Sequence, residues 1–197
     1  MELKSAGVTL TTSRGGTVIV YLLALWIAAA PPKQIAAQNE PPTEYQVKAA
    51  YLLNFARFVE WPQGAFESAN SPLRICVVGS DPFGNDLDSL VQGERIGNHP
   101  VVVARVRIAE ALPSNCHVAF IPEDWPEQRR LIEALRPGVL TVGERPGFLD
   151  EGGIIGFVIE NRRVRFDVSD AAAANSGLKL NSQLLKVART VIPRAHP

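Results

Sequence analysis

Residues 73–84 read LRICVVGSDPFG, and this stretch decides the class of fold. Residues 73–79 are a short apolar run bounded by turn-forming residues, which is typical of a buried strand. Asp81 stands where an N-cap is expected and Pro82 stands at the first helical position, so a short helix should follow. The stretch therefore predicts a strand that leads directly into a helix.

The same alternation continues toward the C-terminus. A helix is expected at residues 125–135, because Leu131, Ile132 and Leu135 have helical spacing and Pro137-Gly138 would stop it. Further short apolar runs predict strands at residues 101–106, 117–121 and 139–142. Strands that alternate with helices favour an α/β fold with a mainly parallel sheet flanked by helices.

The C-terminal part has a different character. Two β-rich runs flank the short link Asn161-Arg162-Arg163 and predict an antiparallel β-hairpin. A short alanine-rich helix should end at Gly177, a residue suited to a left-handed C-cap. A terminal helix should follow, with Asn181 or Ser182 as its N-cap. The expected ranges are 154–160 and 164–168 for the hairpin strands, and 171–176 and 183–191 for the two helices.

Upstream of the deciding stretch, Thr43-Glu44-Tyr45-Gln46 fits a capping box. The helix that follows has an apolar stripe and should run to about Glu60, because Trp61 precedes a proline and avoids helical dihedrals. Without an internal repeat or a low-complexity linker, the sequence predicts one domain.

The first residues are typical of a secretory signal peptide. Residues 18–30 read VIVYLLALWIAAA, an uncharged run that is too short to span a membrane comfortably. We expect residues 1–37 to be removed by cleavage near Ala37-Gln38, which leaves residues 38–197 as an exported domain. The alternative is an uncleaved anchor, in which Pro31, Pro32 and Lys33 mark the far edge of the membrane, and either reading places the domain outside the cytoplasm.

Charge excludes one large class of partners. The 197-residue chain has a formal net charge of zero, and removing residues 1–37 leaves a net charge of −2. A mildly negative domain offers no electrostatic footprint for DNA or RNA, so no nucleic-acid partner is expected.

The sequence offers little for catalysis. The three histidines, His99, His117 and His196, show no metal-ligand spacing, and Cys116 and His117 are neighbours whose side chains should point to opposite faces of a strand. Residues 79–84 could bind a small anion at a helix start, although a plain strand-to-helix turn is the simpler reading. We therefore expect a non-enzymatic protein without a metal or a cofactor, in which His117 is a hydrogen-bonded core residue.

The two cysteines carry the clearest chemical signal. Cys76 and Cys116 fall on two predicted strands, and two thiols in an oxidising compartment usually form a bridge. Such a bridge would stabilise the fold by about 4 kcal/mol in the chain-entropy model. The alternative is a pair of buried free thiols that lie too far apart to join.

A series of short motifs extends along the chain. They are YQVKAAYLLNFARFVEWP at 45–62, ICVVGSDPFG at 75–84 with Leu87, CH at 116–117, FI at 120–121, LTV at 140–142, GF at 147–148, GGII at 152–155, RVRF at 163–166, GLKL at 177–180 and LLK at 184–186. Each motif is weak alone, but their order and spacing are specific. Taken together, they resemble the motifs of the YfiR-like family over nearly all of the expected mature chain.

The resemblance implies a compact α/β domain that acts in the periplasm without catalysis. It implies a repressor that binds the periplasmic sensory part of an inner-membrane, YfiN-like diguanylate cyclase and lowers cyclic-di-GMP synthesis. It also associates the cysteines that match Cys76 and Cys116 with a disulfide. This chain departs from the family pattern by lacking a second cysteine pair, and by having Gly143-Glu144 and Ser169 in two loops.

The family further suggests a homodimer and a small-ligand pocket near the last hairpin. Glu160, Arg163 and Arg165 are the candidates there, and Arg57 and Trp61 are candidates for a second surface. The simpler readings are a solvated hairpin end and a tryptophan packed against the sheet. The alternative function is a periplasmic small-ligand-binding protein that feeds a transporter or a sensor, for which a closed pocket lined by Glu160 and Arg165 would be the evidence.

Overall fold

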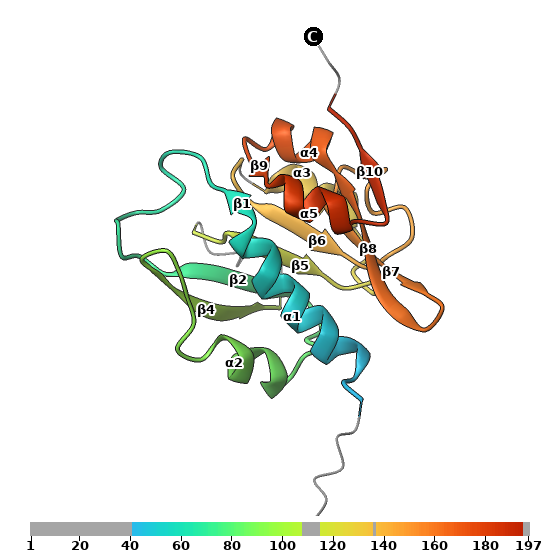
Figure 1. Ribbon diagram of the computed structural model, residues 1–197, viewed down its shortest axis with the longest axis horizontal. Coiled ribbons are helices and arrows are strands. Elements are labelled where there is room, and N and C mark those ends of the chain that lie inside the picture. Colours follow the sequence, from blue (N-terminus) through green and yellow to red (C-terminus); the bar gives the residue numbers. More distant parts are fainter. Residues whose placement is uncertain (1–40, 108–114, 136, 195–197) are drawn as a thin grey trace, which may run out of the picture. The chain divides into compact units, whose positions relative to one another are not determined.

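A computed structural model of the chain describes residues 41–107, 115–135 and 137–194 (Figure 1). These residues form an α/β domain with a mostly parallel sheet flanked by helices, as the sequence predicts. The predicted signal peptide and its cleavage point lie outside the described residues, and so does His196. In the described part, none of the helices has both the length and the apolar character needed to span a membrane.

The helices are α1 (Glu44–Arg57), α2 (Asn85–Val91), α3 (Gln128–Ala134), α4 (Asp170–Asn175) and α5 (Ser182–Val187). The strands are β1 (Val59–Glu60), β2 (Leu73–Val78), β3 (Arg95–Ile96), β4 (His99–Val106), β5 (Val118–Ile121), β6 (Leu140–Gly143), β7 (Ile155–Glu160), β8 (Arg163–Ser169), β9 (Lys179–Leu180) and β10 (Thr190–Ile192). The predicted elements are all present in the predicted order.

The strands of the main sheet run in the order β10-β8-β7-β6-β5-β2-β4-β3 (Figure 1). Strands β4, β2, β5, β6 and β7 are parallel, whereas β8 returns antiparallel to β7 as the predicted hairpin. After β2, the chain forms β4 as the neighbour of β2 on one side. It then forms β5 as the neighbour of β2 on the other side. The strand order therefore reverses between β2 and β5, which is where open α/β sheets commonly hold ligands.

One face of the sheet has an aromatic core. Tyr51 and Phe55 of α1 pack on Phe157 of β7 and Phe166 of β8, and the Phe55 and Phe166 rings are 4.8 Å apart. Helices α2, α4 and α5 add buried residues to the same cluster. This face carries most of the buried apolar side chains.

The opposite face is thinner. Because side chains alternate along a strand, Cys76 and Val78 of β2 point away from the aromatic core to which Ile75 and Val77 belong. Around the cysteines this second face holds the small residues Ala104 and Ala119. Helix α3 and the segment that holds Phe148 complete it.

Helix α1 begins with the predicted capping box, in which Thr43 and Gln46 bond each other's backbone N–H groups. It ends at Arg57, three residues before the predicted end at Glu60. The reason is that Val59 and Glu60 extend as β1 and pair with Leu180 and Lys179 of β9. Glu60 and its partner Lys179 are 119 positions apart, and their pairing ends the helix before Trp61-Pro62 is reached.

The predicted role of Asp81 as an N-cap is wrong. Gly84 occupies the N-cap position of α2, with φ of +52°, and no side chain caps the helix there. The Asp81 carboxylate instead accepts a hydrogen bond from the Phe83 N–H within the turn. The turn after β2 is therefore longer than predicted, and α2 begins at Asn85.

The C-terminal helix is shorter than predicted. Asn181 is its N-cap, but the helix ends at Val187, and residues 190–192 form β10 alongside β8. The helical spacing of Val191 is therefore misleading, because that residue pairs with Val168 in the sheet.

The other corrections are small. The hairpin turn has two residues, Asn161 and Arg162, both with positive φ, and Arg163 already belongs to β8. Strand β4 begins at His99 rather than at Val101, and α3 begins three residues later than expected. Helix α4 is capped by Ser169, and Gly177 has the predicted left-handed conformation.

Candidate functional site

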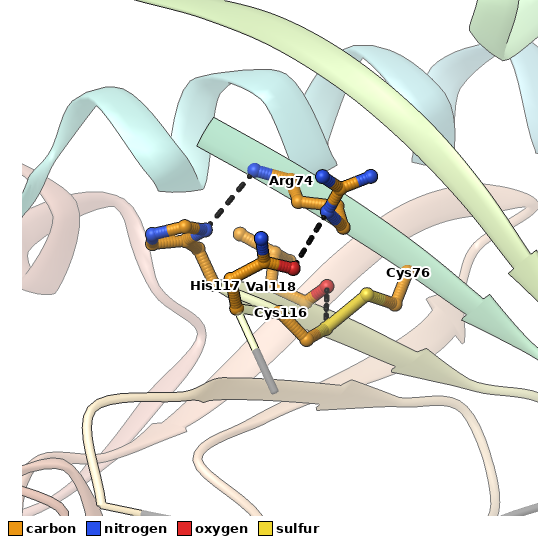
Figure 2. Close-up of a disulfide and its surroundings, with 6 residues drawn as sticks. Arg74, Cys76, Cys116, His117 and Val118 are labelled. Atoms are coloured by element: carbon orange, nitrogen blue, oxygen red, sulfur yellow. Dashed lines mark hydrogen bonds between the residues drawn. A yellow bond between two sulfur atoms is a disulfide. The ribbon is translucent and has the colours of Figure 1, made fainter. Parts of the chain in front are cut away.

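The cysteine pair forms the predicted disulfide (Figure 2). Cys76 lies on β2 and Cys116 lies just before β5, the neighbouring strand, so their Cα atoms are only 6.1 Å apart. This separation is ordinary for a disulfide. Both residues are buried, so the bridge ties the two central strands on the thin face of the sheet.

His117, next to the bridge, is a satisfied core histidine, as expected. It is 2% exposed. Its Nδ1 accepts a hydrogen bond from the Arg74 N–H at 3.1 Å, and its Nε2 lies 3.0 Å from the Ala65 carbonyl oxygen. Since Nδ1 is an acceptor, the ring is neutral and Nε2 carries the proton. Burial lowers the pKa of His117, with smaller contributions from the His99 and Arg74 charges.

His99 and His117 together hold the loop between β1 and β2 in place. The Phe66 ring is stacked between them, with its centroid 3.6 Å from the His99 ring centroid and 4.4 Å from the His117 ring centroid. The Nδ1 atom of His99 lies 2.7 Å from the Ser71 carbonyl oxygen. Trp61 packs edge-on against Phe66 and His117 and is partly buried. Its indole N–H is buried without a hydrogen-bond partner among the described residues.

The crevice where the strand order reverses is filled by the protein itself. A side chain at Gly79 would lie 2.9 Å from the Trp125 ring, which packs over the end of β2. Ser80 donates a hydrogen bond to Asp124 at 2.7 Å across the same gap. The turn that could have cradled a small anion is thus closed by the segment after β5.

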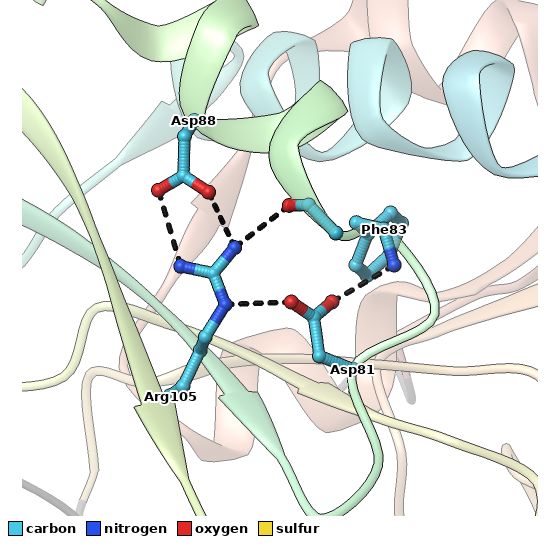
Figure 3. A network of polar contacts seen from close by, with 5 residues as sticks. Asp81, Phe83, Asp88 and Arg105 are labelled. Carbon is cyan, nitrogen blue, oxygen red and sulfur yellow. Dashed lines mark hydrogen bonds and ion pairs between the residues drawn. The ribbon is translucent and has the colours of Figure 1, made fainter.

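Arg105 holds the rest of this turn in place (Figure 3). Its guanidinium donates to the carboxylates of Asp81 and Asp88 and to the Gly84 carbonyl oxygen. Hydrogen bonding from Arg105 lowers the pKa of Asp88, and the same carboxylates raise the pKa of Arg105. Because its donors are engaged, Arg105 fixes β4 to the start of α2 and is not free to bind an anion.

The candidates near the hairpin do not form a pocket. Glu160 and Arg163 are direct partners across the two strands, and both are exposed. Arg165 is exposed opposite Val158, and Glu160 lies 3.8 Å from Arg189. Of these candidates, only Arg163 lines a described groove, which is shared with the first turn of α1. The pocket lined by Glu160 and Arg165 that would favour a ligand-binding protein is not seen among the described grooves.

Arg57, from the second candidate surface, pairs with Glu94 beyond α2. Both side chains are about two-fifths exposed, so this is a surface ion pair. The structure gives no polar contact between Arg57 and Trp61, although both lie near the end of α1.

A groove of about 550 Å³ lies elsewhere, between the first turn of α1, the segments after β5 and β6, and strands β7, β8 and β10. Its most buried charge is Lys48, whose side chain is 4% exposed and lies 2.5 Å from both Glu44 and Glu144. Glu144 also accepts hydrogen bonds from the Tyr45 hydroxyl and the Glu123 N–H. This cluster anchors the start of α1 to the carboxyl end of β6.

The cluster perturbs the ionisation of its members. Burial would lower the pKa of Lys48, but hydrogen bonds to Glu144 and Glu44 and their negative charges outweigh burial and raise it. Burial and the Glu144 charge raise the pKa of Tyr45. Lys48 therefore stays protonated and serves as a structural cation.

Sequence reasoning missed Lys48 and the groove around it. Lys48 and Glu144 are 96 positions apart, and no local spacing connects them. The one available signal is a lysine among the apolar residues Val47 and Ala49 at the start of α1, which predicts a buried partner of opposite charge.

No curated protein matches this chain. Among solved structures, a conserved domain protein from Vibrio cholerae O1 biovar El Tor str. N16961 is similar, with 12% sequence identity and a TM-score of 0.49. The similarity covers 76% of this chain, and this chain spans 60% of the length of that one.

A family model gives a clearer result. The model described as YfiR/HmsC-like matches residues 45–189, which include α1 from its second residue, the disulfide and the hairpin. The match covers well over half of the sequence and bears out the motif order in residues 45–186. The chain belongs to the YfiR/HmsC-like family.

Proposed function

We propose that this protein is an exported regulator that binds the periplasmic sensory part of an inner-membrane diguanylate cyclase and represses cyclic-di-GMP synthesis. The observation that carries the proposal is membership of the YfiR/HmsC-like family, a regulatory and non-catalytic family of the periplasm. His117 is committed to two backbone groups and Arg105 to carboxylates, so both side chains have structural roles.

Repression of this kind needs only differential affinity. If the domain binds the inactive state of the cyclase about tenfold more tightly than the active state, it shifts the equilibrium by about 1.4 kcal/mol. No chemical step is required of the domain. A rigid body that presents fixed surfaces is enough, and the disulfide and the aromatic core supply one.

Two surfaces are proposed to take part in docking or self-association. One is the hairpin end with Glu160, Arg163 and Arg165, whose side chains are exposed. The other is the end of α1 with Arg57 and the partly buried Trp61. A homodimer would present each surface twice, which suits a partner that is itself symmetric.

Two experiments test the proposal. The first is a pull-down of detergent-solubilised inner-membrane proteins with purified residues 38–197, and the second is deletion of the gene that encodes this protein. We expect the cyclase to be retained and cellular cyclic-di-GMP to rise in the deletion strain. Complementation with the full chain should restore the lower level. If no cyclase or other membrane sensor is retained, and deletion leaves cyclic-di-GMP unchanged, the proposal is wrong.

A further inference from the structure

We propose that the groove beside Lys48 is the surface that receives the cyclase, and that the segment it receives carries basic side chains next to apolar ones. This inference rests on the proposed function, and it assigns a surface that the candidate residues from sequence do not include. Its basis is the charge balance of the groove and the apolar side chains exposed around it.

The groove has an excess of carboxylates. Five acidic and three basic side chains line it, which gives a formal charge of −2. The acidic residues are Glu44, Glu123, Glu144, Asp150 and Asp167, and the basic residues are Lys48, Arg145 and Arg189.

All three cations are already engaged within the protein. Lys48 lies between Glu44 and Glu144. Arg145 donates to the carbonyl oxygens of Glu123 and Trp125. The charge of Lys48 is therefore balanced by carboxylates, and the guanidinium of Arg145 is held by backbone carbonyl oxygens.

The third cation, Arg189, pairs with Asp167, and its hydrogen bond lowers the pKa of that carboxyl group. In contrast, the exposed carboxylates of Glu123 and Asp150 have no cationic partner among the described residues. An incoming cation would find these two carboxylates free.

The apolar part of the groove is equally unusual. In the described part of the chain, three large apolar side chains are exposed: Ile159 at 53%, Val187 at 61% and Ile192 at 39%. Two of the three, Ile159 and Ile192, line this groove. Exposed apolar side chains that gather in one groove with a polar rim are typical of a protein–protein contact.

Charge complementarity selects the occupant. A segment with Lys or Arg beside apolar residues would pair with Glu123 and Asp150 and cover Ile159 and Ile192. An acidic segment would meet uncompensated like charge. We therefore commit to a basic, amphipathic segment of the cyclase's periplasmic domain.

The test measures the affinity of residues 38–197 for the purified periplasmic domain of the cyclase by isothermal titration calorimetry. Ile192→Asp and Glu123→Lys should each weaken binding at least tenfold. Val187→Asp and Glu133→Lys are matched controls, because these exposed residues lie outside the groove, and they should bind within twofold of the wild type. Wild-type affinity should fall as salt rises.

Circular dichroism and thermal melting confirm that each variant is folded before it is titrated. Equal binding by the wild type and all four variants would overturn the inference and leave the proposed function standing. A wild type that does not bind the cyclase would overturn the proposed function and the inference with it. If the groove variants change the dimer fraction in sedimentation but not cyclase binding, the groove is an interface between copies and the inference is wrong.

Discussion

The two faces of the sheet are stabilised by different means. On the face covered by α1, the rings of Tyr51, Phe55, Phe157 and Phe166 pack together and supply a large apolar contact area. On the opposite face, the cluster at the centre of the sheet holds Ala119 and Val139 beside Cys76 and Cys116. A covalent bond lies where the side chains are small.

This difference has a simple physical reason. Burial of apolar area stabilises a fold by roughly 25 cal/mol per Å², so aromatic rings contribute far more than alanine side chains. A disulfide contributes mainly by restricting the unfolded chain, and this does not depend on how much side chain surrounds it. The thin face therefore depends on oxidising conditions that keep the disulfide formed, whereas the aromatic face does not.

The largest effect is expected from breaking the aromatic face. Phe55→Ala should lower the free energy of unfolding by about 3–5 kcal/mol, because the ring is 1% exposed and its removal leaves a cavity. Urea denaturation followed by circular dichroism measures this change. A loss below about 1 kcal/mol would show that the aromatic cluster is not the main source of stability.

The second-largest loss of unfolding free energy is expected from removing the disulfide on the thin face. The double variant Cys76→Ala/Cys116→Ala should lose about 2–4 kcal/mol and remain folded, because the aromatic face is intact. The same loss should follow when the wild type is unfolded in the presence of a reductant. If reduction leaves the unfolding midpoint unchanged, the bridge has no stabilising role.

A third test concerns the other end of the thin face, where Phe148 packs against glycine. A methyl group at Gly143 would lie 2.3 Å from the Phe148 ring, so the alanine variant must displace it. Gly143→Ala should cost about 1–3 kcal/mol. Gly64→Ala has open space around the added carbon but a φ of +80°, so its expected loss of about 1–2 kcal/mol measures backbone strain and not a steric clash. A loss below about 1 kcal/mol for Gly143→Ala would contradict the packing argument.

The smallest effect is a pH dependence beside the bridge. Burial lowers the pKa of His117 below the value of about 6.5 that it has in an unfolded chain. The unfolded state therefore binds the proton first, and stability falls as pH drops below about 6.5 toward the folded pKa. Stability curves between pH 8 and 5 should show this decline. His117→Gln should lack it, whereas His99→Gln should keep it.

The sign of this pH dependence of stability tests the protonation state assigned to His117. If the wild type became more stable as pH fell through this range, the neutral Nε2-protonated ring would be the wrong assignment. Nitrogen NMR of the imidazole provides an independent check, because it reports directly which ring nitrogen carries the proton.

Local signals in the sequence predicted much of the fold. The capping box at Thr43, the apolar runs of β2, β5 and β6, and the hairpin all depend on neighbouring residues, and all are present. The disulfide followed from compartment and from family resemblance, and the adjacency of β2 and β5 accounts for it. These features needed no knowledge of distant contacts.

Features that depend on distant contacts were missed or wrong. Val191 has helical spacing but joins β8 as part of β10, and Glu60 leaves the helix because it pairs with Lys179. Asp81 had the right residue type for an N-cap, yet Arg105 and the Phe83 N–H hold it in the preceding turn. The groove beside Lys48 could not be predicted for the same reason, since its walls come from six separate segments.

The central claim is that the domain acts by binding a membrane cyclase and lowering its output. The most direct measurement is the rate of cyclic-di-GMP synthesis by the full-length cyclase in proteoliposomes, with purified residues 38–197 added to the face that bears the sensory domain. The account predicts a saturable fall in rate, and a weaker response when the Ile192→Asp variant is added. A rate that stays constant at every concentration of the wild-type domain would contradict it.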